Sequence, residues 1–152
     1  MKKTTWLLSI VTVLLVSAVL YFFTRPGGVS LSGAAEVDWR LLGELDYISG
    51  KKSPELETQN GKFVRVPGFM VPLEDNMKEV KEFLLVPSPQ ACIHVPPPPP
   101  NQMVLIKMQE GSGAQVAYGP IWVYGTLRIE NIRHLYGESS FQMDAVQIEP
   151  YR

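Results

Sequence analysis

The sequence predicts a mostly β protein: a small five-stranded OB-like barrel with a short N-terminal helix, preceded by a single transmembrane helix. Three observations support this fold class. Short runs of apolar and β-branched residues alternate with turn-forming residues from residue 62 onward. Two of these runs carry a glycine in mid-strand, which allows the strong coiling of small closed barrels. A long apolar stretch stands near the N-terminus.

The apolar stretch covers residues 6–23, and with the two threonines before it the uncharged part reaches 20 residues. At about 1.5 Å per residue, this length crosses a hydrocarbon core of about 30 Å. Two lysines precede it, and basic residues on that side hold the N-terminus in the cytoplasm. We therefore expect residues 1–25 to be a single-pass anchor in the inner membrane, with the domain in the periplasm. A cleaved signal peptide, which would release the domain into the periplasm, is the alternative.

The rest of the chain divides into a tether and a domain. Residues 26–35 are small and polar enough for a flexible tether, and residues 36–152 form the exported domain. Without the three basic residues of the segment 1–25, the net charge falls from −1 to −4. This charge argues against nucleic acid or an anionic lipid surface as a partner. The chain has one cysteine, so it contains no internal disulfide.

A short amphipathic helix is predicted at the start of the domain, over residues 37–48. Its apolar residues recur at near-helical spacing, and Asp38 stands where an N-cap would. Gly50 and Pro54 are expected to end it. The residues that follow, 50–61, are polar and typical of turns.

Five strands are predicted after this helix. The first is expected to be bent by a bulge at Pro67-Gly68, and the fourth holds Gly125 in its interior. A loop is expected over residues 111–120. The predicted strands cover residues 62–73, 80–87, 101–108, 121–130 and 139–150.

The aromatic and methionine side chains are expected to be structural. Aromatic residues spread over separate elements are typical of a barrel core and its lid. Methionines usually fill gaps in a core, so copper binding by them is the less favoured interpretation. His134 follows an arginine in a polar segment, which favours a solvated side chain. The residues concerned are Trp39, Trp122, Tyr118, Tyr124 and Tyr136, and Met70, Met103, Met108 and Met143.

The stretch "ACIHVPPPPPNQ", residues 91–102, carries the main chemical signal. Cys92 and His94 are two positions apart, so in an extended chain both side chains point to the same face. A thiolate and an imidazole suit Zn²⁺ or copper ions far better than Mg²⁺ or Ca²⁺. We therefore identify these two residues as candidate metal ligands, with zinc favoured over copper.

Two ligands are fewer than the four that close a structural zinc site. The others must come from elsewhere in the chain or from a second chain across a two-fold axis, which would make the protein a homodimer. A sparse site also suits a protein that releases its metal. The further candidates within the chain are Glu74, Glu82, Met70, Met103 and His134.

A structural interpretation of the same stretch stands beside the metal site. A free cysteine is often a small buried apolar group, and a histidine beside prolines can bond to the backbone carbonyls they leave free. The proline run is stiff, and it can form a rigid edge or dock onto a partner. The amides after it can cap carbonyls of the turn. The residues with a structural or partner-binding role are Pro96, Pro97, Pro98, Pro99, Pro100, Asn101 and Gln102.

Several strings of the sequence resemble the bacterial domain family of unknown function DUF3299. They are "GKFVRVPGFMVPLE", "EFLLVP", "ACIHVPPPPPNQ" and "IWVYGTLRIE", in this order, within residues 36–152. The resemblance implies an exported, membrane-anchored or lipoprotein-like small β domain. Some members of the family look like accessory components of zinc-uptake systems built on ABC transporters.

Two main functional hypotheses follow. The first is an accessory protein without enzymatic activity that binds or delivers a transition metal, zinc before copper, for an ABC-type transport system. The second is a non-catalytic interaction module of a membrane complex, with Cys92 and His94 in a structural corner. A thiol-dependent enzyme is a weaker third hypothesis, since a Cys–His pair can form a reactive thiolate. No oxyanion hole or third orienting residue can be identified in the sequence.

Overall fold

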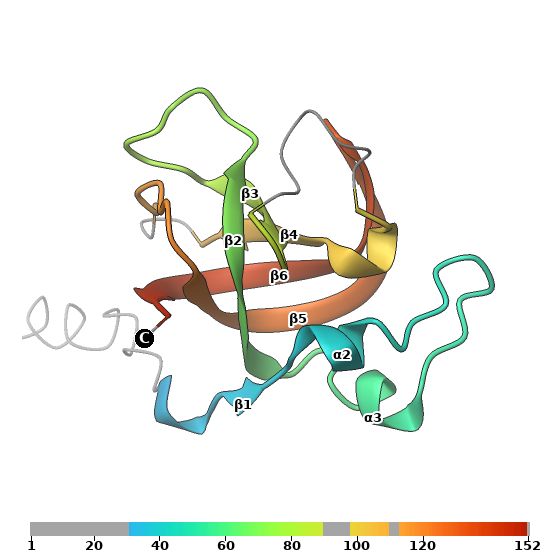
Figure 1. Ribbon diagram of the computed structural model, residues 1–152. Helices are drawn as coiled ribbons and strands as arrows, with labels where there is room; N and C mark the ends of the chain where they lie inside the picture. The colour runs from blue at the N-terminus through green and yellow to red at the C-terminus, as the bar shows by residue number, and fades with distance from the viewer. Residues whose placement is uncertain (1–30, 90–97, 110–112, 152) are drawn as a thin grey trace, which may run out of the picture. The chain divides into compact units, whose positions relative to one another are not determined.

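The computed structural model describes residues 31–89, 98–109 and 113–151 (Figure 1). The chain divides into two compact units between Ser30 and Leu31, and the described residues all belong to the second. Among these residues no helix has both the length and the apolar character needed to cross a membrane. The anchor predicted over residues 1–25 lies outside the described residues.

The described unit is mostly β, with one six-stranded sheet and a few very short helices. We expected five strands, and the sixth is a two-residue strand at the start of the unit. In chain order the elements are η1 (Leu31–Gly33), β1 (Ala35–Glu36), α2 (Trp39–Leu42), α3 (Pro54–Glu57), β2 (Phe63–Pro72), β3 (Glu82–Val86), η2 (Pro100–Gln102), β4 (Val104–Met108), β5 (Ile121–His134) and β6 (Gly137–Pro150).

The strand order is β1-β2-β3-β4-β6-β5, and β2 also pairs with β5. The hydrogen-bonded pairs therefore run from β2 through β3, β4, β6 and β5 back to β2. All these pairs are antiparallel except β4 with β6, which is parallel. β1 adds to the outside of this circuit as a parallel partner of β2. In Figure 1, β5 and β6 lie side by side as a long curved hairpin.

β2 is shared between two partners because it changes neighbours in its middle. Phe63 to Gly68 pair with β5, whereas Phe69 to Pro72 pair with β3. Buried and less buried residues alternate through Pro67 and Gly68 without a break, so the bulge that we expected there is wrong. Gly68 instead allows the backbone of β2 to lie close to the end of β3. A Cβ at this position would lie 2.8 Å from the backbone oxygen of Val86.

β5 and β6 change register at two places, and the first lies at Gly125. Tyr124 pairs with Gln147 and Gly125 with Ala145, so Val146 is an extra residue on β6. A Cβ on Gly125 would lie 2.4 Å from the backbone oxygen of Asp144, a distance that side chains do not reach. Gly125 lies inside β5, as expected, and only a residue without a side chain fits this close approach of the two strands.

The predicted helix over residues 37–48 is wrong in length. α2 spans only Trp39–Leu42, and Gly43 is its C-cap. Asp38 is the N-cap as expected, since its side chain accepts a hydrogen bond from the amide of Leu41 at 2.8 Å. A glycine loses more backbone entropy than other residues in a helix, so the four-residue helix ends where the glycine occurs.

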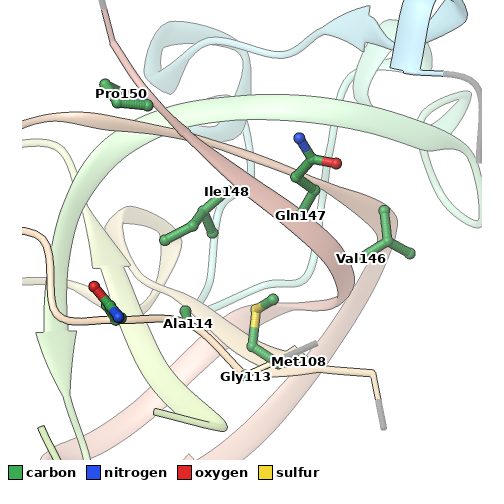
Figure 2. Close-up of a pocket in the computed structure, with 8 residues that line it drawn as sticks. Met108, Gly113, Ala114, Val146, Gln147, Ile148 and Pro150 are labelled. Atoms are coloured by element: carbon green, nitrogen blue, oxygen red, sulfur yellow. The ribbon is translucent and has the colours of Figure 1, made fainter. Parts of the chain in front are cut away.

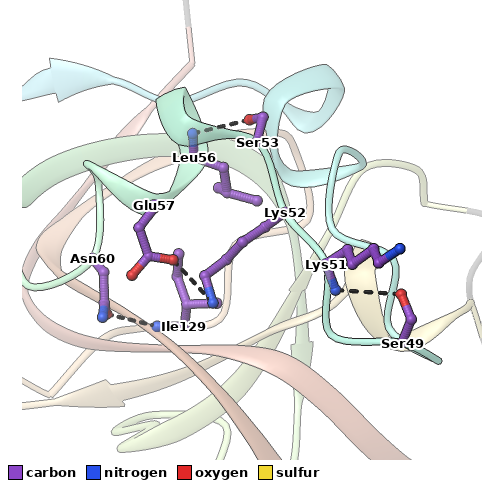
Figure 3. Close-up of polar contacts among 8 residues, drawn as sticks. All are labelled: Ser49, Lys51, Lys52, Ser53, Leu56, Glu57, Asn60 and Ile129. Atoms are coloured by element: carbon purple, nitrogen blue, oxygen red, sulfur yellow. Dashed lines mark hydrogen bonds and ion pairs between the residues drawn. The ribbon is translucent and has the colours of Figure 1, made fainter.

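A second short helix, α3, lies in the region expected to hold only turns. Ser53 caps its N-terminus by accepting from the Leu56 amide, and Lys52 forms an ion pair with Glu57 at 2.9 Å (Figure 3). The chain after α3 is fixed to the sheet, because Asn60 Oδ1 accepts a hydrogen bond from the Ile129 amide at 3.0 Å. α3 and the chain after it are thus held against β5.

The domain begins earlier than predicted. Leu31–Gly33, which we assigned to the tether 26–35, form a 3-10 turn, and Ala35 already belongs to β1. β1 pairs Ala35 with Val64 and Glu36 with Arg65. Two residues are too few for a hydrophobic alternation to be visible, which is why the sequence did not reveal this strand.

Two apolar clusters lie on opposite faces of the strands. In β3, Phe83 and Leu85 belong to the main core, whereas Leu84 and Val86 belong to a second cluster. Successive side chains of a strand point to opposite faces, so the second cluster lies on the outer face of β3 and β4. Met103 and Leu105 complete it, and Phe69 and Val71 of β2 pack against it.

Candidate functional site

The structure describes only part of the candidate site from the sequence. Cys92, His94, Pro96 and Pro97 lie outside the described residues, whereas Pro98 to Gln102 lie within them. The segment that holds all of them connects β3 to β4. These two strands are adjacent and antiparallel, with Leu85 paired to Val104. The described ends of this connection, up to Pro89 and from Pro98 onward, thus adjoin neighbouring strands.

The end of the proline run has a defined backbone. Pro99 has φ −61° and ψ 153°, which are polyproline II values. Pro100 begins η2, and the Gln102 amide donates to the Pro99 carbonyl oxygen at 2.8 Å. Proline at the first helical position is favourable because its missing N–H would have no partner there.

Asn101 ties this loop to the N-terminal part of the domain. Its side-chain amide donates to the carbonyl oxygen of Leu45 at 2.9 Å, and a longer contact of 3.5 Å reaches the carbonyl of Gly43. The residues after α2 are thereby joined to η2 across 56 positions of sequence. We expected this amide to cap carbonyls of its own turn, whereas it caps carbonyls of the loop after α2.

We predict that Asn101→Ala lowers the free energy of unfolding by about 1–2 kcal/mol, because it leaves the partly buried Leu45 carbonyl without this donor. Urea unfolding followed by tryptophan fluorescence measures the change. Asn131→Ala is the matched control, since Asn131 is an exposed asparagine of β5, and it should change the value by less than about 0.5 kcal/mol. Equal effects of the two substitutions would contradict the structural role.

The other proposed ligands do not gather around one point. Met70 and Met103 are buried in different clusters. Glu74 Oε1 accepts hydrogen bonds from the amides of Lys81 and Glu82, at 3.2 and 2.8 Å. Among the described residues there is no group of three or more His, Cys, Asp or Glu side chains that could hold a metal ion. A further protein ligand for a Cys92–His94 site is therefore not evident in the described part of the chain.

His134 lies at the end of β5 and is half-buried, so the expectation of a solvated side chain is wrong. Its Nδ1 accepts a hydrogen bond from the Tyr136 amide at 3.2 Å. Burial lowers the pKa of His134 below its usual value, since desolvation disfavours the imidazolium. The imidazole is thus neutral at pH 7 and engaged in a local turn.

The five aromatic residues differ in exposure, and Trp39 and Trp122 are half-buried. Tyr124 is buried, and its hydroxyl donates to Glu149 at 3.1 Å. Tyr118 and Tyr136 are exposed, 91% and 39%, so assigning them to the core or its lid is wrong. The prediction that methionines fill the core agrees better with the structure, since Met70, Met103 and Met143 are buried. Met108 is partly buried and packs against the main core.

An aromatic groove that the sequence did not reveal lies outside β2. Its volume is about 300 Å³. We call it the outer aromatic groove. Trp39 is held on one side of it by a hydrogen bond from Nε1 to the Pro67 carbonyl, at 2.6 Å. The groove is lined by Trp39, Pro67, Gly68, Phe69, Pro87, Pro120 and Tyr151.

One charged residue borders these aromatic rings. Arg65 lies two residues before Pro67, on the same face of β2. Its guanidinium is 4.4 Å from the ring centre of Trp122, whose ring is 4.9 Å from that of Tyr151. It also pairs with Glu36 at 3.0 Å. Hydrogen bonding to Tyr124 and to Glu36 raises the pKa of Arg65 further above its usual value, so the residue is a permanent cation.

A second pocket, of about 450 Å³, lies between the end of β6 and the loop at Gly113–Gln115 (Figure 2). Figure 2 shows Met108 beside Ala114, and the bulge residue Val146 at the edge of the pocket. The described lining holds two amide side chains, Gln115 and Gln147, and no titratable side chain. This composition provides no group for acid–base or metal chemistry.

Together the fold and these surfaces define a small, mostly β domain with an aromatic groove and a largely apolar pocket among its described residues. Comparison with known proteins gives the family. The model of "Protein of unknown function (DUF3299)" matches residues 47–150, and the chain belongs to this family. A search of curated proteins finds no match.

A solved structure supports the same assignment. The chain is similar to the crystal structure of a DUF3299 family protein from Pseudomonas aeruginosa PAO1, with 32% sequence identity and a TM-score of 0.63. The similarity covers 79% of this chain and 97% of the other. The sequence resemblance to DUF3299 is thus confirmed.

Proposed function

We propose that the protein is an exported, membrane-anchored accessory protein that binds or delivers a transition metal, zinc before copper, for an ABC-type transport system. The proposed ligands are Cys92 and His94. The observation that carries the proposal is their place in the chain: the connection between β3 and β4, with Pro98 to Gln102 at its end. Binding residues are frequent on loops held by a rigid scaffold, and the Asn101 hydrogen bond provides such a support.

The location belongs to the same proposal. The uncharged stretch at residues 4–23 and the lysines before it support a single-pass anchor in the inner membrane, with the domain in the periplasm. A domain released into the periplasm after cleavage remains the alternative. A homodimer in which each chain gives one Cys–His pair would supply four ligands, the number that closes a zinc site.

The pairing circuit supports an OB-like barrel as the finer description of the fold. β2 to β6 are five strands, and each is paired with two others of the set. The mid-strand glycines Gly68 and Gly125 stand where neighbouring backbone approaches most closely. These are features of a small closed barrel.

We predict that zinc affinity falls roughly 100-fold in Cys92→Ser and in His94→Ala, because each substitution removes one of few ligands. The measurement is zinc titration of the purified full chain, with elemental analysis of the bound metal. His134→Ala is the matched control, since it removes the only other histidine, and its affinity should stay unchanged. Equal affinities in the wild type and in Cys92→Ser would contradict metal binding at this pair.

A second candidate function is a non-catalytic interaction module of a membrane complex. The outer aromatic groove favours it, because aromatic and proline side chains that line a surface cavity are typical of protein recognition. In this case Cys92 and His94 form a structural corner. The zinc titration distinguishes the two functions. If Cys92 is only structural, Cys92→Ser and the wild type give the same titration curve.

A further inference from the structure

The outer aromatic groove lies beside an acidic surface, since Asp38 of that surface directly precedes Trp39 of the groove. The groove presents the rings of Trp39, Phe69 and Tyr151 together with three prolines. Trp39 is positioned by its own hydrogen bond to Pro67, so its ring is presented in a fixed orientation. Grooves of flat aromatic rings bind proline-rich segments well, because the polyproline II helix is preformed and loses little entropy on binding.

A carboxylate-rich pocket of about 250 Å³ shares α2 with the groove, since Trp39 lines the groove and Arg40 lines this pocket. We call its three acids, Glu36, Asp38 and Glu55, the acidic rim. Asp38 directly precedes Trp39 of the groove. Glu36 is paired with Arg65, and Glu55 has no ion pair among the described residues.

The three carboxylates of the acidic rim outnumber the two cations paired with them, Arg40 and Arg65. Arg40 also lines the pocket, and its guanidinium is 3.8 Å from Asp38. Arg65 is already placed over Trp122 and against Glu36. The exported part of the chain has a net charge of −4. Both the local and the overall charge therefore favour a positively charged occupant.

The spacing between rim and groove sets the length of the occupant. Arg65, Pro67 and Phe69 point outward from β2 in a row, and Glu36 lies beside Arg65. Four residues of a strand span about 13 Å, which a polyproline II helix covers in about four residues. A basic side chain about four residues from a docked proline would thus reach the rim.

We propose that the outer aromatic groove binds an extended, proline-rich segment of a partner protein, and that a lysine or arginine of this segment pairs with the acidic rim. This site specifies the partner chemistry of the interaction module proposed above and rests on that second function. The chain's own proline run, "VPPPPPNQ", has no lysine or arginine, so the rim disfavours a second copy as the occupant. The negative domain likewise disfavours an anionic bilayer.

Two synthetic peptides test the proposal, the basic RAAPPPPP and the acidic EAAPPPPP, titrated into the full chain in detergent micelles. Calorimetry gives the affinities. We expect the basic peptide to bind about tenfold more tightly than the acidic one. Tyr151→Ser should weaken both by about tenfold, because it removes one ring of the groove.

Matched variants separate the groove from general effects. Tyr118→Ser removes an exposed tyrosine elsewhere and should leave both affinities unchanged. Glu55→Gln should reduce the preference for the basic peptide, whereas Glu44→Gln, at an exposed acid outside both pockets, should not. Cys92→Ser should bind the peptides like the wild type, so loss of metal binding and loss of peptide binding are distinguished.

Four results would overturn the proposal. They are no binding of either peptide at millimolar concentration, equal effects of Tyr151→Ser and Tyr118→Ser, a charge preference that Glu55→Gln leaves unchanged, and self-association or vesicle binding that depends on Tyr151. The vesicles are of phosphatidylglycerol, and self-association is followed by light scattering. Unfolding curves of Tyr151→Ser check that the fold is intact.

Discussion

Gly125→Ala is expected to lower the free energy of unfolding by about 3 kcal/mol or more. The added Cβ would lie 2.4 Å from the backbone oxygen of Asp144 and 2.8 Å from the Cα of Ala145. Both are backbone atoms of the paired strand, so no rotation of a side chain can relieve the overlap. β5 and β6 must then separate at the point where their register shifts.

The measurement for Gly125→Ala is urea unfolding of the purified protein, followed by tryptophan fluorescence. Gly119→Ala is the matched control, because no heavy atom lies within 4 Å of its added Cβ. It should change the free energy of unfolding by no more than about 0.5 kcal/mol. A Gly125→Ala protein as stable as Gly119→Ala would show that the two strands are farther apart than described here.

Phe83→Ala is expected to destabilise the protein by about 4 kcal/mol. Phe83 is fully buried in the main core, on β3 between its partners β2 and β4. The substitution removes a large apolar side chain and leaves a cavity that hydrogen-bonded neighbours on both sides cannot readily fill.

Phe83→Leu keeps the variant series measurable if the alanine protein does not fold, and its loss of stability should be intermediate. Tyr118→Ala is the surface control, since this ring is 91% exposed, and its effect should stay within about 0.5 kcal/mol. Thermal and urea unfolding give the values. A loss of less than about 1 kcal/mol in Phe83→Ala would place this side chain outside the core.

The strands were largely predictable, since proline and glycine mark their ends. Pro72 ends β2 and Pro150 ends β6, each within one residue of the predicted limit. β5 runs on to His134, four residues beyond the limit that we predicted. Its last residues are mostly exposed and polar, so the apolar pattern that marks a strand is lost there although pairing with β6 continues.

The helical predictions were less accurate, because a correct apolar spacing does not secure a helix. Leu41, Leu42 and Leu45 are buried as the pattern predicted, yet the helix ends at Gly43 and the chain reaches Leu45 through a turn. Ile48, the last apolar residue of the pattern, is 84% exposed. Burial of these leucines depends on the sheet that they cover, and helical pairing is not required for it.

The groove could not be predicted, since its lining comes from five separate places in the sequence. Trp39, Phe69 and Tyr151 meet only after β2 has paired with β5 and the C-terminal residues have returned beside Pro120. Contacts between positions this far apart leave no local periodicity. The Cys92–His94 pair, by contrast, is evident in the sequence but lies outside the described residues.

The two-sided pairing of β2 to β6 also limits how this protein can associate with others. Where a strand has a partner on each side, as β5 has from Ile121 to Thr126, it offers few free backbone donors or acceptors, so addition of a foreign strand is disfavoured there. The same pairing protects these segments against growth into extended aggregates. Recognition at these doubly paired segments therefore uses the side chains of the outer surface rather than the backbone.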